Sequence, residues 1–349
     1  MIGRCLLLTG NTPNTTRFQG RDQYETAVAV SQAVWANPAD PMMRPGAVML
    51  ARGDGMCYQD ALVSSPLMHF PRNGPVLLTE PTHLNPVVRE EILRLSPTGK
   101  SAPAQVLTIG SLSMSVDEEV RRLGFTVCRV GGPDPVATAV AVWDIVGAKR
   151  QVMLVSGERF EEALPAAGWA AHMEDPILLA GRDYLPPATA CAIRQTQPDV
   201  YILGGPGSVS TEVERAVRGL TCGFVDRICG RDAFETAINF TRYCSPTGKF
   251  GWCVREKRGW GFRFARYDRW YGGISGNPLS HMGKHAPLLL VEPDLVPPSV
   301  EEYILSVNPR HLEPKPPYMH GFLVGTVEDI ACPVQWRLES LLTTVDEHG

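Results

Sequence analysis

Short apolar runs alternate with helical patterns along the chain. In the first third, runs typical of buried strands lie at 47–51, 76–79, 106–109 and 125–128. The helical patterns around them occupy 23–35, 57–69, 86–95 and 115–123. Strands that are apolar throughout, with helices between them, indicate a parallel sheet covered on both faces. Right-handed crossovers then predict a three-layer, Rossmann-like α/β unit.

One motif occurs three times. RFQGRDQYETA at 17–27 returns as RVGGPDPVATA at 129–139 and as RICGRDAFETA at 227–237. Apolar segments follow each copy in the same order, so we expect one domain used three times. The predicted units are 1–127, 128–225 and 226–349. Three similar units in one chain predict a pseudo-threefold arrangement.

Charge and hydropathy exclude some functions. The 349 residues carry a net charge of −4, which gives no reason to expect nucleic acid or an acidic membrane as a partner. No apolar run approaches the roughly 18 residues of a membrane span, so we expect no membrane insertion. Nothing in the sequence indicates a cofactor.

The cysteines indicate a compartment. Their number, nine, is odd, none forms a CxxC pair, and they do not recur at equivalent repeat positions. This pattern argues against a repeated disulfide or metal site and favours a reducing compartment. The first apolar run is too short for a signal-peptide core. We therefore expect a cytoplasmic protein if the N-terminus is complete, and a cell-wall or extracellular protein if a leader has been removed.

The repeated pattern, together with Gln59-Asp-Ala-Leu62 and the segment 200–210, resembles the cell wall binding repeat type 2 family. The resemblance spans residues 17 to about 345. It implies three tandem Rossmann- or Toprim-like units and an anchor for anionic cell-wall polymers. Where that family has Asp-Arg-Tyr, this chain has Asp22-Gln-Tyr24, Asp134-Pro-Val136 and Asp232-Ala-Phe234.

The repeated acids are predicted to be structural. Asp22, Asp134 and Asp232 each stand where a helix should begin, so we interpret them as N-cap residues. The threonines four residues later are expected to support the same packing. Asp60 and Glu162 occupy one repeat position, but Gly272 replaces them in the third unit, which argues against a threefold catalytic acid.

Two local patterns have alternative interpretations. Gly204, Gly205, Gly207 and Ser208 follow a strand and could cradle a phosphate, but a tight turn that needs positive φ is the favoured interpretation. His281 and His285 are spaced to share a helix face, yet no third ligand follows at a recognisable spacing. We therefore predict no metal site.

We interpret residues 250–271 of the third unit as an aromatic and basic insertion. Its candidate binding residues are Trp252, Arg255, Arg258, Trp260, Phe262, Arg263, Phe264, Arg266, Tyr267, Arg269 and Trp270. These residue types are common in protein interfaces. The alternatives are a hairpin whose aromatic rings cover the neighbouring unit, or a site for a polymer or nucleic acid.

The leading hypothesis is a non-catalytic binding or assembly protein that engages a protein partner, or a second copy, through this insertion. The first alternative is an anchor on anionic cell-wall polysaccharide. The second is an enzyme that binds a nucleotide or sugar phosphate beside Gly204–Ser208.

Overall fold

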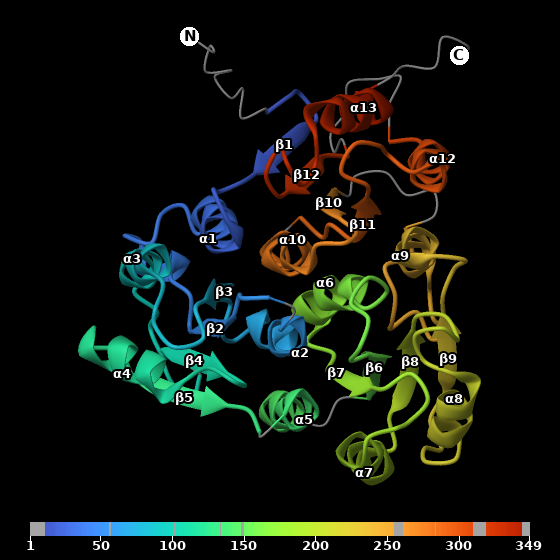
Figure 1. The fold of residues 1–349 in the computed structure, drawn as a ribbon, viewed down its shortest axis with the longest axis horizontal. Coiled ribbons are helices and arrows are strands. Elements are labelled where there is room, and N and C mark those ends of the chain that lie inside the picture. The colour runs from blue at the N-terminus through green and yellow to red at the C-terminus, as the bar shows by residue number, and fades with distance from the viewer. Residues whose placement is uncertain are drawn as a thin grey trace.

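The structure is a computed structural model, and it describes residues 11–55, 57–100, 102–132, 134–147, 150–254, 261–282, 284–309 and 319–343. These residues form three parallel four-stranded sheets with helices packed around them, arranged as a triangle (Figure 1). The expected fold class, three tandem α/β units with parallel sheets, is confirmed.

The three sheets have the same strand order. In the first unit the order is β3-β2-β4-β5, and in the second it is β7-β6-β8-β9. The third unit has the order β11-β10-β12-β1. The strands are β1 (Thr15–Phe18), β2 (Val48–Arg52), β3 (Val76–Thr79), β4 (Val106–Ile109), β5 (Val127–Val130), β6 (Gln151–Ser156), β7 (Ile177–Ala180), β8 (Asp199–Leu203), β9 (Val225–Ile228), β10 (Phe262–Arg266), β11 (Leu288–Val291) and β12 (Gly321–Val324).

The first strand of each repeated motif completes the sheet of the preceding unit. β5 pairs with β4, and β9 pairs with β8, although both strands carry the start of the next motif. β1 near the N-terminus pairs with β12 near the C-terminus, where Phe18 lies opposite Val324. This exchange closes the three units into a ring, and in Figure 1 the first and last strands lie together.

Each unit has a matching set of helices. The helices are α1 (Gln23–Val34), η1 (Pro41–Met43), α2 (Tyr58–Val63), η2 (Ser65–Met68), α3 (Pro86–Leu95), α4 (Met114–Arg122), α5 (Pro135–Val146), α6 (Leu164–Met173), α7 (Pro187–Thr196), α8 (Thr211–Arg218), α9 (Ala233–Arg242), α10 (Trp270–Ser275), α11 (Pro278–His281), α12 (Pro298–Val307) and α13 (Cys332–Thr343). Helices α2, α6 and α10 lie nearest the middle of the triangle (Figure 1).

The predicted N-caps are confirmed. The Asp22 carboxylate accepts a hydrogen bond from the Glu25 backbone N–H at 2.8 Å, and Asp134 and Asp232 make the same contact at the starts of α5 and α9. The threonine four residues later supports the turn. Thr26, for example, accepts a hydrogen bond from the Gly20 N–H at 3.0 Å. These repeated residues therefore fix the entry into each helix.

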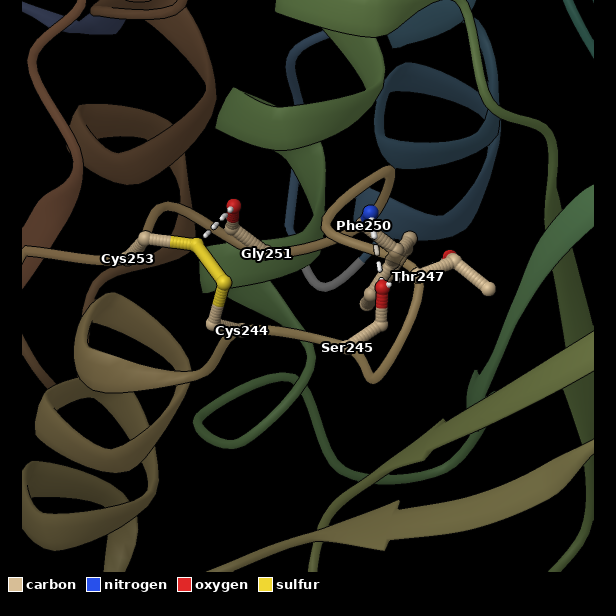
Figure 2. The surroundings of a disulfide bond; sticks show 6 residues. All are labelled: Cys244, Ser245, Thr247, Phe250, Gly251 and Cys253. Carbon is tan, nitrogen blue, oxygen red and sulfur yellow. Dashed lines mark hydrogen bonds between the residues drawn. A yellow bond between two sulfur atoms is a disulfide. The ribbon is translucent and has the colours of Figure 1, made fainter.

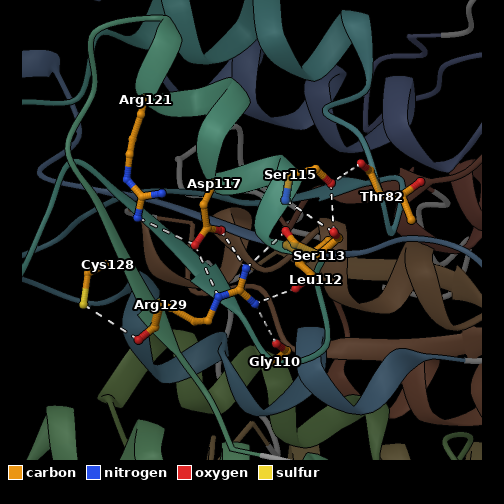
Figure 3. Close-up of polar contacts among 9 residues, drawn as sticks. All are labelled: Thr82, Gly110, Leu112, Ser113, Ser115, Asp117, Arg121, Cys128 and Arg129. Carbon is orange, nitrogen blue, oxygen red and sulfur yellow. Dashed lines mark hydrogen bonds and ion pairs between the residues drawn. The ribbon is translucent and has the colours of Figure 1, made fainter.

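The arginine that opens each motif fastens the sheet edge to the unit before it. Figure 3 shows Arg129 donating to the backbone oxygens of Gly110, Leu112 and Ser113 and to the carboxylate of Asp117 on α4, with an Nη2–Oδ1 distance of 2.8 Å. Arg227 makes the equivalent contacts to Gly204, Ser210 and Glu214, and Arg17 to Gly325, Thr326, Ile330 and Gln335. A buried guanidinium with several acceptors of fixed geometry is a strong positional constraint.

Four histidines gather where the units meet. The ring centroids of His69 and His281 are 4.9 Å apart, and those of His172 and His285 are 4.7 Å apart. His281 is also bonded to Asn73 at 2.8 Å. His69 and His281 thus pack against each other where the units meet. Among the described residues, no three His, Cys, Asp or Glu side chains come together in a way that could hold a metal ion.

The loop before β10 contains a disulfide that the sequence did not indicate. Cys244 and Cys253 are bonded to each other, and Figure 2 shows the loop that they close. Within this loop the Phe250 N–H donates to the Ser245 hydroxyl at 3.1 Å. The cysteine pattern argued against a repeated disulfide and did not reveal this single one, because spacing alone does not show which residues a loop brings together.

Candidate functional site

Most of the described part of the predicted insertion is buried core. Phe262, Arg263 and Phe264 have no exposed area, and Trp270 and Trp252 are 3% and 9% exposed. Phe262, Arg263 and Phe264 are buried because residues 262–266 form β10, an interior strand that pairs with β11 and β12 on its two sides. Trp270 lies in α10, and Trp252 packs against Trp169. None of these five side chains can form the partner-binding surface that the sequence predicts. Arg255, Arg258 and Trp260 lie outside the described residues.

Arg263 illustrates the error. Its guanidinium is buried and donates to the backbone oxygens of Ala286 at 3.2 Å and Gly273 at 3.0 Å. Burial lowers the pKa of Arg263 to about 9. Gly168 leaves room for it, because a Cβ there would lie 2.5 Å from Arg263 Nη2. This arginine supports the packing of α6 against the third unit.

The aromatic residues of the loop cover the neighbouring unit, as one alternative proposed. Phe250 stacks on Tyr201 of the second unit with centroids 3.7 Å apart, and Trp252 packs edge-on against Trp169 at 5.2 Å. The loop does this without a hairpin. Of the remaining candidates, Arg266 forms an ion pair with Asp268, Tyr267 packs against Phe234, and Arg269 is exposed.

The glycine turn after β8 is also occupied from within. Gly204 has φ +120°, so the turn interpretation is correct at this residue. The Glu162 carboxylate accepts hydrogen bonds from the Gly205 N–H at 3.3 Å, from the Ser208 hydroxyl and from Thr236. A carboxylate already stands where a phosphate would bind, so the alternative of a phosphate cradle at Gly204, Gly205, Gly207 and Ser208 is not supported.

The other two units satisfy the same turn with their own carboxylates. In the first unit, Asp60 accepts from the N–H and the hydroxyl of Ser111 at 3.0 and 2.9 Å. In the third unit, where Gly272 replaces the acid, Asp329 accepts from the Thr326 N–H at 2.9 Å and from the Tyr271 hydroxyl. These three acids hold the strand ends in shape.

A hollow of about 610 Å³ opens at the carboxyl ends of β6 and β7. We call it the strand-end pocket. Parallel sheets commonly bind ligands at this end of their strands. The residues that matter below are Gln59 from the first unit and Asp134, Val136, Gly157, Glu158, Gly181 and Tyr184 from the second. Gln59 donates to the Gly157 oxygen at 3.0 Å, so the pocket spans the contact between the two units.

In the first and third units an aromatic ring occupies the equivalent place. Tyr24 stands at the motif position of Val136 and lies directly on Gly53, where a Cβ would be 2.4 Å from its ring. Burial and a hydrogen bond with Glu80 raise the pKa of the Tyr24 hydroxyl. In the third unit Phe234 packs on Tyr267, with centroids 5.1 Å apart. Val136 is too small to do the same.

Two further differences distinguish the second unit. Gly181 follows β7 at the position that Glu80 has after β3, and the Tyr184 ring lies where a side chain at residue 181 would begin, 1.9 Å from an added Cβ. In the first unit, Arg52 at the end of β2 forms an ion pair with Asp54, with nitrogen–oxygen distances of 2.9 and 2.7 Å. In the second unit, Ser156 stands at the position of Arg52 and Glu158 at that of Asp54, so this ion pair has no counterpart there. The second unit has therefore exchanged internal contacts for an open hollow.

A second hollow of about 360 Å³ continues between α5 and α7, and we call it the helix pocket. The two pockets share Ala188. Trp143 lines the helix pocket, and its indole N–H is buried with no hydrogen-bond partner among the described residues. This nitrogen has almost no accessible surface, so a group bound in the hollow would not reach it in this conformation.

The sequence contained a signal for this site. Val136 replaces the aromatic residue of the motif, Tyr24 or Phe234, in the second copy alone. Pro135 stands where the family has an arginine and Val136 where it has a tyrosine, and it is the loss of the tyrosine ring that leaves the pocket open.

The fold and the pockets define a ring of three α/β repeats with a ligand-sized hollow in one of them. The sequence pattern of the family "Cell wall binding domain 2 (CWB2)" matches residues 17–117 and 129–214, and the chain belongs to this family. The resemblance that the motifs indicated is confirmed.

Relatives and solved structures agree with this assignment. The chain is 30% identical over 235 residues to the "Amidase enhancer" of Bacillus subtilis (strain 168), which is 66% of this chain and 30% of that protein. Two structures from Clostridium difficile share the fold: Cwp8 has a TM-score of 0.73 and Cwp6 of 0.76, each 20% identical and covering 95% of this chain. The chain spans 52% and 48% of those two proteins.

Proposed function

We propose that this chain is a non-catalytic module that attaches to a polymer of the cell wall. The observation that carries the proposal is the strand-end pocket, with the helix pocket beside it between α5 and α7. Membership of the CWB2 family supports the same function. Two adjacent hollows suit successive units of an extended chain better than one compact metabolite.

The polar groups at the strand ends support binding rather than chemistry. Asp60, Glu162 and Asp329 each accept hydrogen bonds from their own turn. A general acid or base must reach a proton of the substrate. These three carboxylates are instead part of the scaffold, which weakens the hypothesis of an enzyme at Gly204–Ser208.

The proposed location is the cell wall. Disulfides persist mainly in oxidising environments, and the Cys244–Cys253 bond fits a protein outside the cytosol. The described residues contain no helix that is long and apolar enough to cross a membrane.

A protein partner or a second copy, held by the third unit, is a weaker candidate. The aromatic side chains that motivated it, Phe262, Phe264 and Trp270, are core residues. Size-exclusion chromatography with light scattering tests self-assembly, and a monomer at all concentrations would remove the version in which two copies associate.

Sedimentation with purified cell walls tests the proposed function. We expect the intact protein to pellet with walls and to remain in the supernatant without them. The titration should be run at low and high salt, because attraction between exposed charges is screened as ionic strength rises. Protein that stays in the supernatant at both ionic strengths would overturn the proposal.

A further inference from the structure

The strand-end pocket lies where the other two units have an aromatic side chain and the second unit has Val136. The first and third units place Tyr24 and Phe234 in the equivalent space, each in contact with the residue that follows the central strand. The second unit keeps the surrounding backbone but has Val136 there. A hollow of about 610 Å³ remains beside it, lined also by Tyr184, whose ring lies over Gly181.

We propose that the strand-end pocket binds one pyranose ring of a neutral or amino sugar, in the place where the other units put their own aromatic rings. This inference rests on the proposed function, since it names the chemical class that the wall polymer presents to the second unit.

The lining of the pocket suits a six-membered ring with an apolar face. Its floor is apolar, formed by Leu179, Val136 and the start of α7 at Pro187. Tyr184 is 59% exposed and presents its ring beside this floor. An apolar ring face can therefore be buried while its edge remains at the mouth of the pocket, which is the usual design of small-ligand sites.

The polar groups favour a sugar over an aromatic side chain of a partner protein. Asp134 and Glu158 line the pocket, and ionised carboxylates only accept hydrogen bonds. The Tyr184 hydroxyl and the oxygen of the Gln59 amide are further possible acceptors. A pyranose has several hydroxyl donors around its edge, whereas a phenol ring has one and a phenyl ring has none.

The charges at the pocket select among sugars. Among the described residues neither carboxylate has an arginine partner as Asp54 has in Arg52, and two unpaired carboxylates disfavour a phosphate or carboxylate on the bound ring and favour a neutral or protonated amino sugar. The next ring of the polymer would reach the helix pocket.

Saturation-transfer NMR with four probes tests the inference on the full chain. The probes are N-acetylglucosamine, glucosamine, glucose 6-phosphate and p-cresol. We expect saturation transfer to the first two, little to glucose 6-phosphate, and a Val136→Phe variant that weakens sugar binding at least about tenfold. Tyr24→Phe is the matched control, because it keeps the ring at the same motif position in the first unit.

Val136→Phe should fold, since it restores the residue type that the third unit has, and its melting temperature should not fall. If it fails to fold, Tyr184→Ala replaces it as the test, because the exposed ring of Tyr184 can be removed without opening the core.

Each contrary outcome overturns a defined part. Binding of p-cresol without any sugar would assign the pocket to an aromatic side chain. Strongest binding of glucose 6-phosphate would refute the charge argument, and sugar binding unchanged in both pocket variants, or absent from the wild type, would refute the site. Wild-type protein that pellets with walls while binding no probe would sink this inference alone, whereas sugar binding without pelleting would sink the proposed function alone.

Discussion

Acidification should loosen the ring of units through the histidines where the units meet. His172 lies on α6 and faces His285, and His281 lies on α11 and faces His69, the residue after η2. Burial, followed by the charges of the neighbouring histidines, lowers the pKa of both His172 and His281 from 6.5 to about 4. The other charged pair near this junction is Arg72 with Glu174.

The sign of the effect follows from the direction of the shift. A histidine with a lowered folded-state pKa binds its proton more readily when unfolded, so its stabilising contribution is present above pH 6.5 and is lost as the pH falls towards 4. Between pH 7.5 and 5, each fully insulated ring would lose about 2 kcal/mol. Both rings are partly exposed, so we halve this figure and expect about 2 kcal/mol for the two together.

Urea unfolding at pH 7.5 and pH 5, followed by tryptophan fluorescence, measures this difference. The double variant His172→Gln, His281→Gln is the comparison, and its stability should change much less over the same interval. Carboxylates with lowered pKa values, such as Asp54 and Asp268, lose their contributions mainly at lower pH. Equal pH dependence in the wild type and the double variant would refute the assignment to these rings.

Three further changes test the scaffold by urea unfolding. Arg129→Ala leaves the buried Asp117 carboxylate without its closest partner and should lower the free energy of unfolding by about 3 kcal/mol. The control Arg122→Ala removes an exposed ion pair and should lower it by less than about 0.5 kcal/mol. Similar values for both variants would show that Arg129 does not hold β5 in place. Replacing Cys244 and Cys253 together by alanine opens a loop with a sequence separation of 9 and should cost about 2–3 kcal/mol, with Cys222→Ser as a neutral control; no loss would mean that the bond does not form. Tyr24→Val removes a ring that is 5% exposed and should cost about 3 kcal/mol, while Val136→Ala, beside an existing hollow, should cost less; the reverse order would contradict the comparison of the units.

Local patterns were sufficient to predict the repeated scaffold. Apolar runs located most strands of the first unit to within a residue or two, and β5 begins at Val127, two residues after the predicted start. The helix starts at Asp22, Asp134 and Asp232 could be read directly, because an N-cap is a short-range interaction between a side chain and the next turn.

The third unit could not be read in the same way. The alternation of aromatic and basic residues in Phe262–Arg266 is typical of an exposed strand, yet Arg263 is accommodated by distant groups, namely the Gly273 and Ala286 oxygens and the space beside Gly168. Nothing local to residue 263 indicates that environment. The missing ring at Val136 can be seen by aligning the three motif copies, but the hollow beside the ends of β6 and β7 becomes visible only in the structure.

The central claim is that the second unit holds the wall polymer in a hollow that its sister units fill with their own rings. Co-sedimentation of wild type, Val136→Phe and Tyr24→Phe with purified walls tests it most directly. The account predicts that Val136→Phe loses wall binding by at least about tenfold while Tyr24→Phe binds like the wild type. Equal binding by all three proteins would contradict it.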